Sequence, residues 1–158
     1  MTDQTITAYF KNDHERLDGL FLQFQASQKD NPSQAKEYFR DFKSGLERHI
    51  AWEEELLFPL FEKTTGMSEG GPTAVMRYEH EGLRETLRNI HSKVQSDRFD
   101  TQAESVILMA VLCEHNRKEE NILYPMIDHM TTAKDREEIF SRMKDFPDKH
   151  SCCCGMHE

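Results

Sequence analysis

The chain repeats its chemically most distinctive residues at a fixed spacing of 66 positions. The clearest stretch runs from His49 to Pro59 (HIAWEEELLFP) and returns from His115 to Pro125 (HNRKEENILYP). Three pairs of matching polar residues recur at this spacing: His14 and His80, His49 and His115, Glu53 and Glu119. The simplest interpretation is a duplicated unit whose two copies fold in the same way.

Apolar residues recur at helical spacing through four long segments, and the histidines and glutamates lie on the same stripes. The segments are 5–27 and 32–62 in the first half, and 73–94 and 100–129 in the second. The first two stripes are Phe10, His14, Leu17, Phe21, Phe24 and then Phe42, Leu46, His49, Glu53, Leu56, Leu60. The last two are Met76, His80, Leu83, Leu87, Ile90 and then Leu108, Leu112, His115, Glu119, Ile122, Met126. The repeat therefore covers the expected core as well as the polar residues.

Four similar helices with short connections predict an all-α fold, an antiparallel up-and-down four-helix bundle built from a duplicated two-helix unit. The bundle domain is expected over residues 1–146, with repeat halves at about 5–62 and 73–130, and a short charged helix from Thr132 to about Met143. The Cys-rich C-terminal tail, 147–158, has little to bury and is expected to be mobile. A chain of 158 residues is long enough for one such domain with a substantial core.

The composition limits the classes of binding partner and the cellular location that can be expected. The formal charge of −9, from 20 basic and 29 acidic residues, argues against nucleic acid or an anionic membrane as a partner. No apolar stretch approaches the ~18–20 residues of a spanning helix, and the N-terminus lacks signal-peptide character. Cys113 stands alone and Cys152–Cys154 are adjacent, which is unlike a secreted disulfide framework. A cytoplasmic location is expected.

The stripes place four imidazoles and two carboxylates inside the expected core. A buried, ionised carboxylate faces a desolvation cost of several kcal/mol unless a cation or partner offsets it. A spacing of four puts His and Glu on one helix face, about 5–6 Å apart at Cβ. We therefore predict a metal site made by His14, His49, Glu53, His80, His115 and Glu119.

Two metal ions suit this ligand set. The simplest arrangement gives His14 and His49 to one ion, His80 and His115 to the other, and makes Glu53 and Glu119 bridges. Each ion then has two imidazoles and carboxylate oxygen, close to the two-His-one-carboxylate set of non-haem iron sites, with open positions for O₂, peroxide or nitric oxide. The same ligands also suit manganese, zinc or cobalt, so the residues alone leave the metal open.

These residues resemble the hemerythrin-like, His-His-Glu cation-binding family, from about Tyr9 to His129. In that family, one His on each of the first and third helices, and a His plus a carboxylate on the second and fourth, bind the metal. The resemblance implies two non-haem iron ions bridged by carboxylates. Two departures separate the chain from oxygen carriers: Arg84 replaces a further His, and Glu119 lies four residues after His115 where carriers have Asp five residues after. The pattern is closer to the bacterial di-iron stress and iron–sulfur repair type.

The function that this resemblance implies is that of a stress-response protein that binds or reduces O₂, peroxide or nitric oxide, or donates iron for iron–sulfur repair. An iron-accepting or redox protein is the implied macromolecular partner. A reversible O₂ carrier or sensor, and a metal-stabilised interaction module, are the alternatives. Whether the protein is an enzyme, and its oligomeric state, are left open by the sequence.

Several other residues are compatible with more than one role. Surface positions or a supporting layer behind the ligands are expected for Glu15, Glu54, Glu81 and Glu120. Packing is the commoner role for Tyr9, Tyr78 and Tyr124, and a hydrogen bond to a bound oxygen species is the alternative. Surface positions are expected for His91, His129 and His150, whereas Arg84 is either solvated or at the mouth of the site. The thiols of Cys152–Cys154 are either incidental or bind a soft metal.

Overall fold

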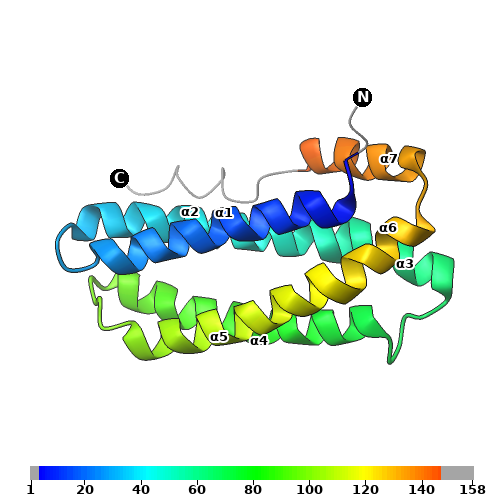
Figure 1. The fold of residues 1–158 in the computed structure, drawn as a ribbon. Coiled ribbons are helices and arrows are strands. Elements are labelled where there is room, and N and C mark those ends of the chain that lie inside the picture. The colour runs from blue at the N-terminus through cyan, green and yellow to red at the C-terminus, as the bar shows by residue number, and fades with distance from the viewer. Residues whose placement is uncertain (1–3, 147–158) are drawn as a thin grey trace.

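The computed structural model describes residues 4–146, and every regular element in that range is a helix (Figure 1). The elements are α1 (Ile6–Ser27), α2 (Pro32–Trp52), the π-helical turn η1 (Glu53–Leu57), α3 (Phe58–Thr65), α4 (Pro72–Gln95), α5 (Gln102–Lys118), the π-helical turn η2 (Glu119–Leu123), α6 (Tyr124–Met130) and α7 (Ala133–Lys144). The all-helical prediction is confirmed. The predicted tail, with His150 and Cys152–Cys154, lies outside the described residues, and the domain boundary before it stays a prediction.

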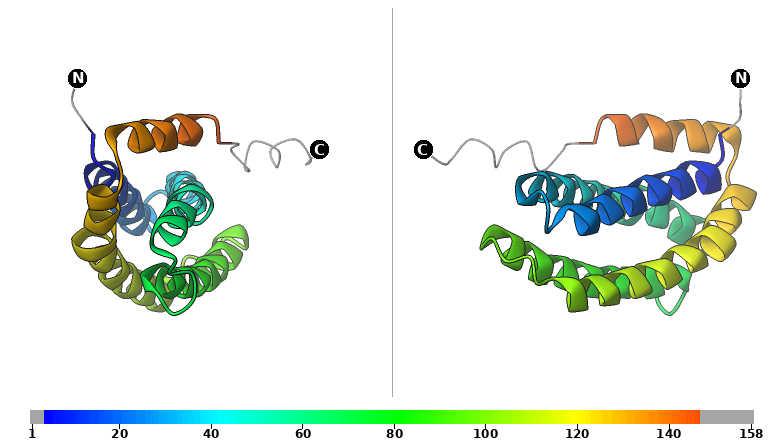
Figure 2. Two further views of the ribbon diagram at one scale, coloured as in Figure 1. Left: turned by 90° about the vertical axis from the view of Figure 1, so that its right-hand side faces the viewer. Right: turned by 60° about the vertical axis from the view of Figure 1, so that its left-hand side comes forward.

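The helices form four rods, because α2, η1 and α3 are continuous, as are α5, η2 and α6. Figures 1 and 2 show α1 beside α2 in one pair and α4 beside α5 in a second pair, with short connections between neighbouring ends. The short helix α7 follows α6 and packs against the η1 region. The four rods fit a four-helix bundle, and its antiparallel up-and-down order stays a prediction. The derivation of its halves from one duplicated unit stays a prediction.

Local sequence explains where the helices begin and end. The Thr5 side chain accepts a hydrogen bond from Ala8 N–H at the start of α1, and Asn31 does the same for α2. A capping box between Thr132 and Asp135 starts α7. At the end of α3, Gly66 adopts a φ of 73°, a left-handed conformation that favours glycine.

The apolar core is divided into two clusters by a polar layer. One cluster lies beside the α1–α2 turn and contains Phe21, Phe24, Phe39 and Phe42 among other residues. The other lies toward α3, α6 and α7 and contains Phe10, Phe58, Phe61 and Tyr124 among others. Along α1, α4 and the α5–α6 rod, the predicted metal ligands lie between the residues of the two clusters, and along the α2–α3 rod they lie where the two clusters meet. The site is thus enclosed by apolar side chains at both ends.

The two π-helical turns have a common cause in the repeated proline. Phe58 N–H donates to the carbonyl of Glu53, five residues back, and Tyr124 N–H donates to the carbonyl of Glu119 in the same way. The next residue in each rod is a proline, Pro59 or Pro125, which has no N–H and whose ring clashes with the carbonyl four residues earlier. A wider turn ahead of the proline relieves this conflict.

The extra residue in each wide turn shifts the buried stripe, and part of the predicted core is wrong for this reason. Ile122 and Met126 were expected to be buried, but they are 52% and 40% exposed. Their neighbours Leu123 and Ile127 are buried instead. An α-helical register cannot be continued through a π-helical turn, because that turn adds a residue.

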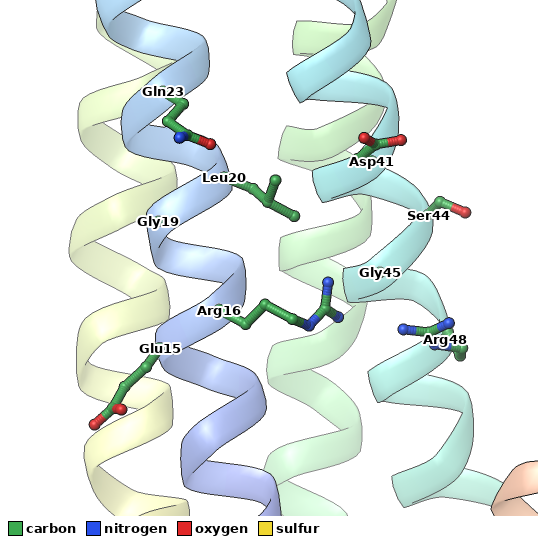
Figure 3. Close-up of a pocket in the computed structure, with 9 residues that line it drawn as sticks. All are labelled: Glu15, Arg16, Gly19, Leu20, Gln23, Asp41, Ser44, Gly45 and Arg48. Atoms are coloured by element: carbon green, nitrogen blue, oxygen red, sulfur yellow. The ribbon is translucent and has the colours of Figure 1, made fainter.

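Helices α1 and α2 approach closely at Gly45. A Cβ atom at this position would lie 2.7 Å from Leu17 Cδ2, too near for unshifted side chains. The outer face of the same pair carries a groove of about 610 Å³, into which Arg16 and Arg48 project (Figure 3). The groove is lined by none of the six predicted ligands. Within residues 4–146, no helix is long and apolar enough to cross a membrane.

Candidate metal centre

The six predicted ligands converge in the polar layer, and each is at most 3% exposed. Potential ligand atoms of Glu53, His80, His115 and Glu119 all lie within 4.8 Å of one another. A second group with the same property contains His14, His49 and Glu119. Glu119 therefore belongs to both groups. We refer to the six residues together as the His/Glu cluster.

Each glutamate of the cluster faces one histidine from its own rod and one from another. Glu53 Oε1 lies 3.4 Å from Nε2 of both His49 and His80. Glu119 Oε1 lies 3.0 Å from His115 Nε2 and 3.4 Å from His14 Nε2. Since each glutamate is the first residue of a π-helical turn, the wide turn begins at the carboxylate that faces the cluster.

Four further carboxylates hold the opposite side of the imidazoles. The Nδ1 atoms of His14, His49, His80 and His115 lie 2.9, 2.8, 2.8 and 3.1 Å from Glu120, Asp13, Glu54 and Glu79, respectively. A carboxylate that accepts from Nδ1–H fixes the imidazole so that the Nε2 lone pair can bind a metal. We call Asp13, Glu54, Glu79 and Glu120 the holding carboxylates.

Several buried polar atoms of the cluster lack a hydrogen bond within the described chain. They are Glu53 Oε1, His80 Nε2 and both carboxylate oxygens of Glu119. Leaving such an atom unsatisfied costs about 1–3 kcal/mol, and more for a charged group. All belong to residues of one group of ligand atoms that lie within 4.8 Å of one another, and all are ligand types for a transition metal. The donor set therefore fits bound cations.

The pKa shifts within the His/Glu cluster also favour a bound cation. Burial raises the pKa of Glu53, and the negative charge of Glu119 raises it further. Burial alone would raise the pKa of Glu119, but the neighbouring Glu53 side chain and the positive charge of His115 hold it well below its usual range. Burial alone would lower the pKa of His14 and His80, but the nearby carboxylates raise both to about 9. Without metal, the buried negative charge is thus balanced by protons, which a cation would displace.

The two halves of the site differ at one pair of repeat positions, Phe58 and Tyr124. The Tyr124 hydroxyl donates a hydrogen bond to Glu53 Oε2 over 2.8 Å, and it lies 3.3 Å from Nε2 of both His14 and His49. Phe58 instead stacks on His80, with ring centroids 5.8 Å apart. The polar contacts near His14 and His49 are therefore absent at the matching place in the other half.

Sequence reasoning did not single out Asp13 and Glu79 as supporting residues, although they match at the same spacing of 66 and would have been found by extending the repeat. The holding role of Glu54 and Glu120 was one of two alternatives, and the contacts above support it. Exposed positions are found for Glu15, Glu81 and His129, while His91 is partly buried.

The remaining candidates lie away from the cluster. Tyr78 is 81% exposed, and Tyr9 packs against Phe140 with ring centroids 5.0 Å apart. Arg84 Nη2 donates to Glu54 Oε1 over 2.7 Å. The guanidinium is therefore bound to a holding carboxylate, and the pKa of Glu54 falls to about 2, because contacts with His80 and Arg84 outweigh its burial.

Known proteins of similar sequence include iron–sulfur cluster repair proteins. An iron–sulfur cluster repair protein, YtfE, from Escherichia coli O81 (strain ED1a) is 29% identical over 138 residues, which cover 78% of this chain and 63% of that protein. YtfE from Enterobacter sp. (strain 638) is 28% identical over 140 residues, with the same coverage. A DNA nickase from Nostoc sp. is 24% identical over 143 residues, which cover 90% of this chain and 39% of the nickase.

The chain thus spans less than two thirds of the length of these relatives. No solved structure matches it. The Hemerythrin HHE cation binding domain matches residues 5–127, which include all six residues of the His/Glu cluster and the four holding carboxylates. The chain belongs to the hemerythrin HHE cation-binding family.

Proposed function

We propose that this protein is a non-haem di-iron protein of the stress response that donates iron for iron–sulfur repair or binds or reduces O₂, peroxide or nitric oxide. The observation that supports this proposal best is the buried layer in which four Nε2 atoms and two carboxylates lie close together. Three carboxylate oxygens of this layer have no hydrogen bond within the described chain. Apolar clusters on both sides exclude water from this layer.

The six residues of the His/Glu cluster would bind metal, and the four holding carboxylates orient the histidines. One ion would be held by His14 and His49 and the other by His80 and His115, with Glu53 and Glu119 shared between them. The holding carboxylates keep the Nδ1 protons, so that Nε2 stays available. Two iron ions bound there would supply one-electron chemistry and open coordination positions.

Iron donation has support from the relatives that are named iron–sulfur cluster repair proteins. Donation requires that iron leaves the cluster, whereas reaction with a small molecule requires that it stays. An iron-accepting or redox protein is the partner that both versions imply, and the cytoplasm is the proposed location. The net charge of −9 disfavours nucleic acid as a partner.

Reversible oxygen carriage is the second candidate, and the contacts of Arg84 count against it. This residue occupies the position of an imidazole in oxygen carriers and donates to Glu54 here. An interaction module is the third candidate, in which the metal only stabilises the bundle. Its distinguishing property is partner binding that survives replacement of Glu53 and Glu119 by Gln.

The test begins with protein purified without oxygen and assayed for iron per chain. We expect about two irons, and a new near-ultraviolet and visible absorption after oxidation. The iron-loaded protein is then mixed with a metal-free ferredoxin, and the two are separated by size before iron is measured in each. Iron in the ferredoxin supports donation, whereas iron retained with a spectrum altered by peroxide or nitric oxide supports small-molecule chemistry. Absence of iron binding would overturn both versions.

A further inference from the structure

The difference between Tyr124 and Phe58 breaks a repeat that is otherwise kept throughout the site. The six residues of the His/Glu cluster and the four holding carboxylates all match at the spacing of 66. Phe58 and Tyr124 match in position, and both are fully buried, but only one carries a hydroxyl. A buried phenol costs free energy unless it has a polar partner. The polar atoms that surround the Tyr124 hydroxyl therefore indicate its role.

The distances from the Tyr124 oxygen to two imidazole nitrogens suit three ligands of one metal ion. It lies 3.3 Å from Nε2 of His14 and 3.3 Å from Nε2 of His49. Nitrogen and oxygen donors at about 2.0–2.2 Å from one ion lie about 2.8–3.6 Å from each other in tetrahedral or octahedral sites. One ion can therefore contact all three atoms with little movement of the side chains.

We propose that Tyr124 is a further metal ligand, giving its phenolate oxygen to the ion held by His14 and His49. The inference rests on the proposed di-iron function and makes the two ions chemically different. The ion held by His80 and His115 faces Phe58 at the matching position and receives no such oxygen. Exogenous small molecules are therefore directed to the second ion.

Coordination breaks the O–H bond and forms a metal–oxygen bond. The proton passes to Glu53 Oε2, which accepts this O–H over 2.8 Å, while Glu53 Oε1 faces His49 and His80. Iron(III) binds a phenolate more strongly than iron(II) does, so the oxidised protein is the form to test.

The test uses the full chain, loaded with iron(II) without oxygen and then oxidised with ferricyanide, which accepts one electron from each iron. We expect a visible phenolate-to-iron(III) charge-transfer band, and phenolate ring vibrations in resonance Raman spectra excited within it. Tyr124→Phe should abolish both signals while two irons per chain remain. Tyr9→Phe is the matched control, because Tyr9 packs against Phe140 away from the cluster, and it should keep both signals.

Three results are decisive. Two irons in the wild-type protein without phenolate vibrations would overturn the Tyr124 assignment and leave the di-iron function intact. Signals that persist in Tyr124→Phe would also overturn it. No iron in the wild-type protein would overturn the proposed function itself. A wild-type spectrum without phenolate vibrations overturns the assignment whether or not the variant folds.

Discussion

His80 Nδ1 lies 2.8 Å from Oε2 of Glu54, the residue that follows Glu53 in the chain. The equivalent pair in the other half, His14 and Glu120, makes the same contact over 2.9 Å. Adjacent glutamates thus divide two roles: one faces the centre of the His/Glu cluster and the next holds a histidine of the opposite half. The halves are therefore joined by reciprocal contacts, and a change in either half should affect the other.

Replacing Glu54 by Gln should weaken metal binding without removing a proposed ligand. The amide carries no charge, so it orients and polarises His80 less effectively. Loss of such a supporting contact typically lowers metal affinity about 10–100-fold. Competition with a coloured chelator measures this change. Glu55→Gln, at an exposed position in the same turn, is the control and should bind like the wild type. Equal affinity for all three proteins would show that the contact does not support the metal.

Replacing Glu119 by Ala should reduce the binding of both metals, because Glu119 belongs to both groups of ligand atoms. Replacing His14 by Ala should mainly weaken one ion, since His14 belongs to one group. Elemental analysis after gel filtration gives the metal content per chain. His129→Ala, at an exposed position, is the control. If Glu119→Ala retains two irons and an unchanged spectrum, the bridging assignment is wrong.

The metal-free protein should lose stability as the pH rises from about 6.5 to 9. The pKa values of His14 and His80 are raised from 6.5 to about 9 in the folded chain. A raised pKa stabilises the folded state fully below the unfolded value, and this stabilisation is lost as the pH rises through the folded value. Each histidine accounts for about 3 kcal/mol, at about 1.4 kcal/mol per pKa unit.

Urea unfolding of chelator-treated protein between pH 6 and pH 10 measures this loss. The metal-loaded protein is the comparison, and its stability should not fall over the same range, because the metal takes the place of the protons. Calorimetry at neutral pH in buffers of different ionisation enthalpy should show protons released on metal binding. A flat stability profile for the metal-free protein would contradict the assigned protonation of the cluster.

Two helical glycines should respond differently to alanine. Gly82 is exposed and a Cβ there meets nothing within 4 Å, so Gly82→Ala should raise the free energy of unfolding by about 0.5–1 kcal/mol. At Gly45 the same Cβ would lie 2.7 Å from Leu17 Cδ2. Overpacking of this kind costs about 1–3 kcal/mol, so Gly45→Ala should give no gain or a net loss. Chemical denaturation compares the two variants with the wild type, and an equal gain for both would argue against a close approach of α1 and α2.

The helices and the choice of the six candidate ligands could be predicted because the relevant signals are local. Helical periodicity places His49 and Glu53 on one face, and the repeat at 66 positions assigns the same role to His115 and Glu119. Their burial follows from the apolar stripe on which they lie. Sequence by itself thus determined the helical class and brought forward the six candidate ligands.

Only the tertiary structure decided how these residues are supported and where the stripes fail. The contact of Tyr124 with His14 joins residues 110 positions apart, and that of His49 with Asp13 joins residues 36 apart. Both depend on how separate rods pack, which periodicity within one rod does not specify. The exposure of Ile122 likewise follows from a π-helical turn that adds a residue before the proline. Spacing along a helix fixes its face, but contacts between rods and changes of helical register are settled only when the chain packs together.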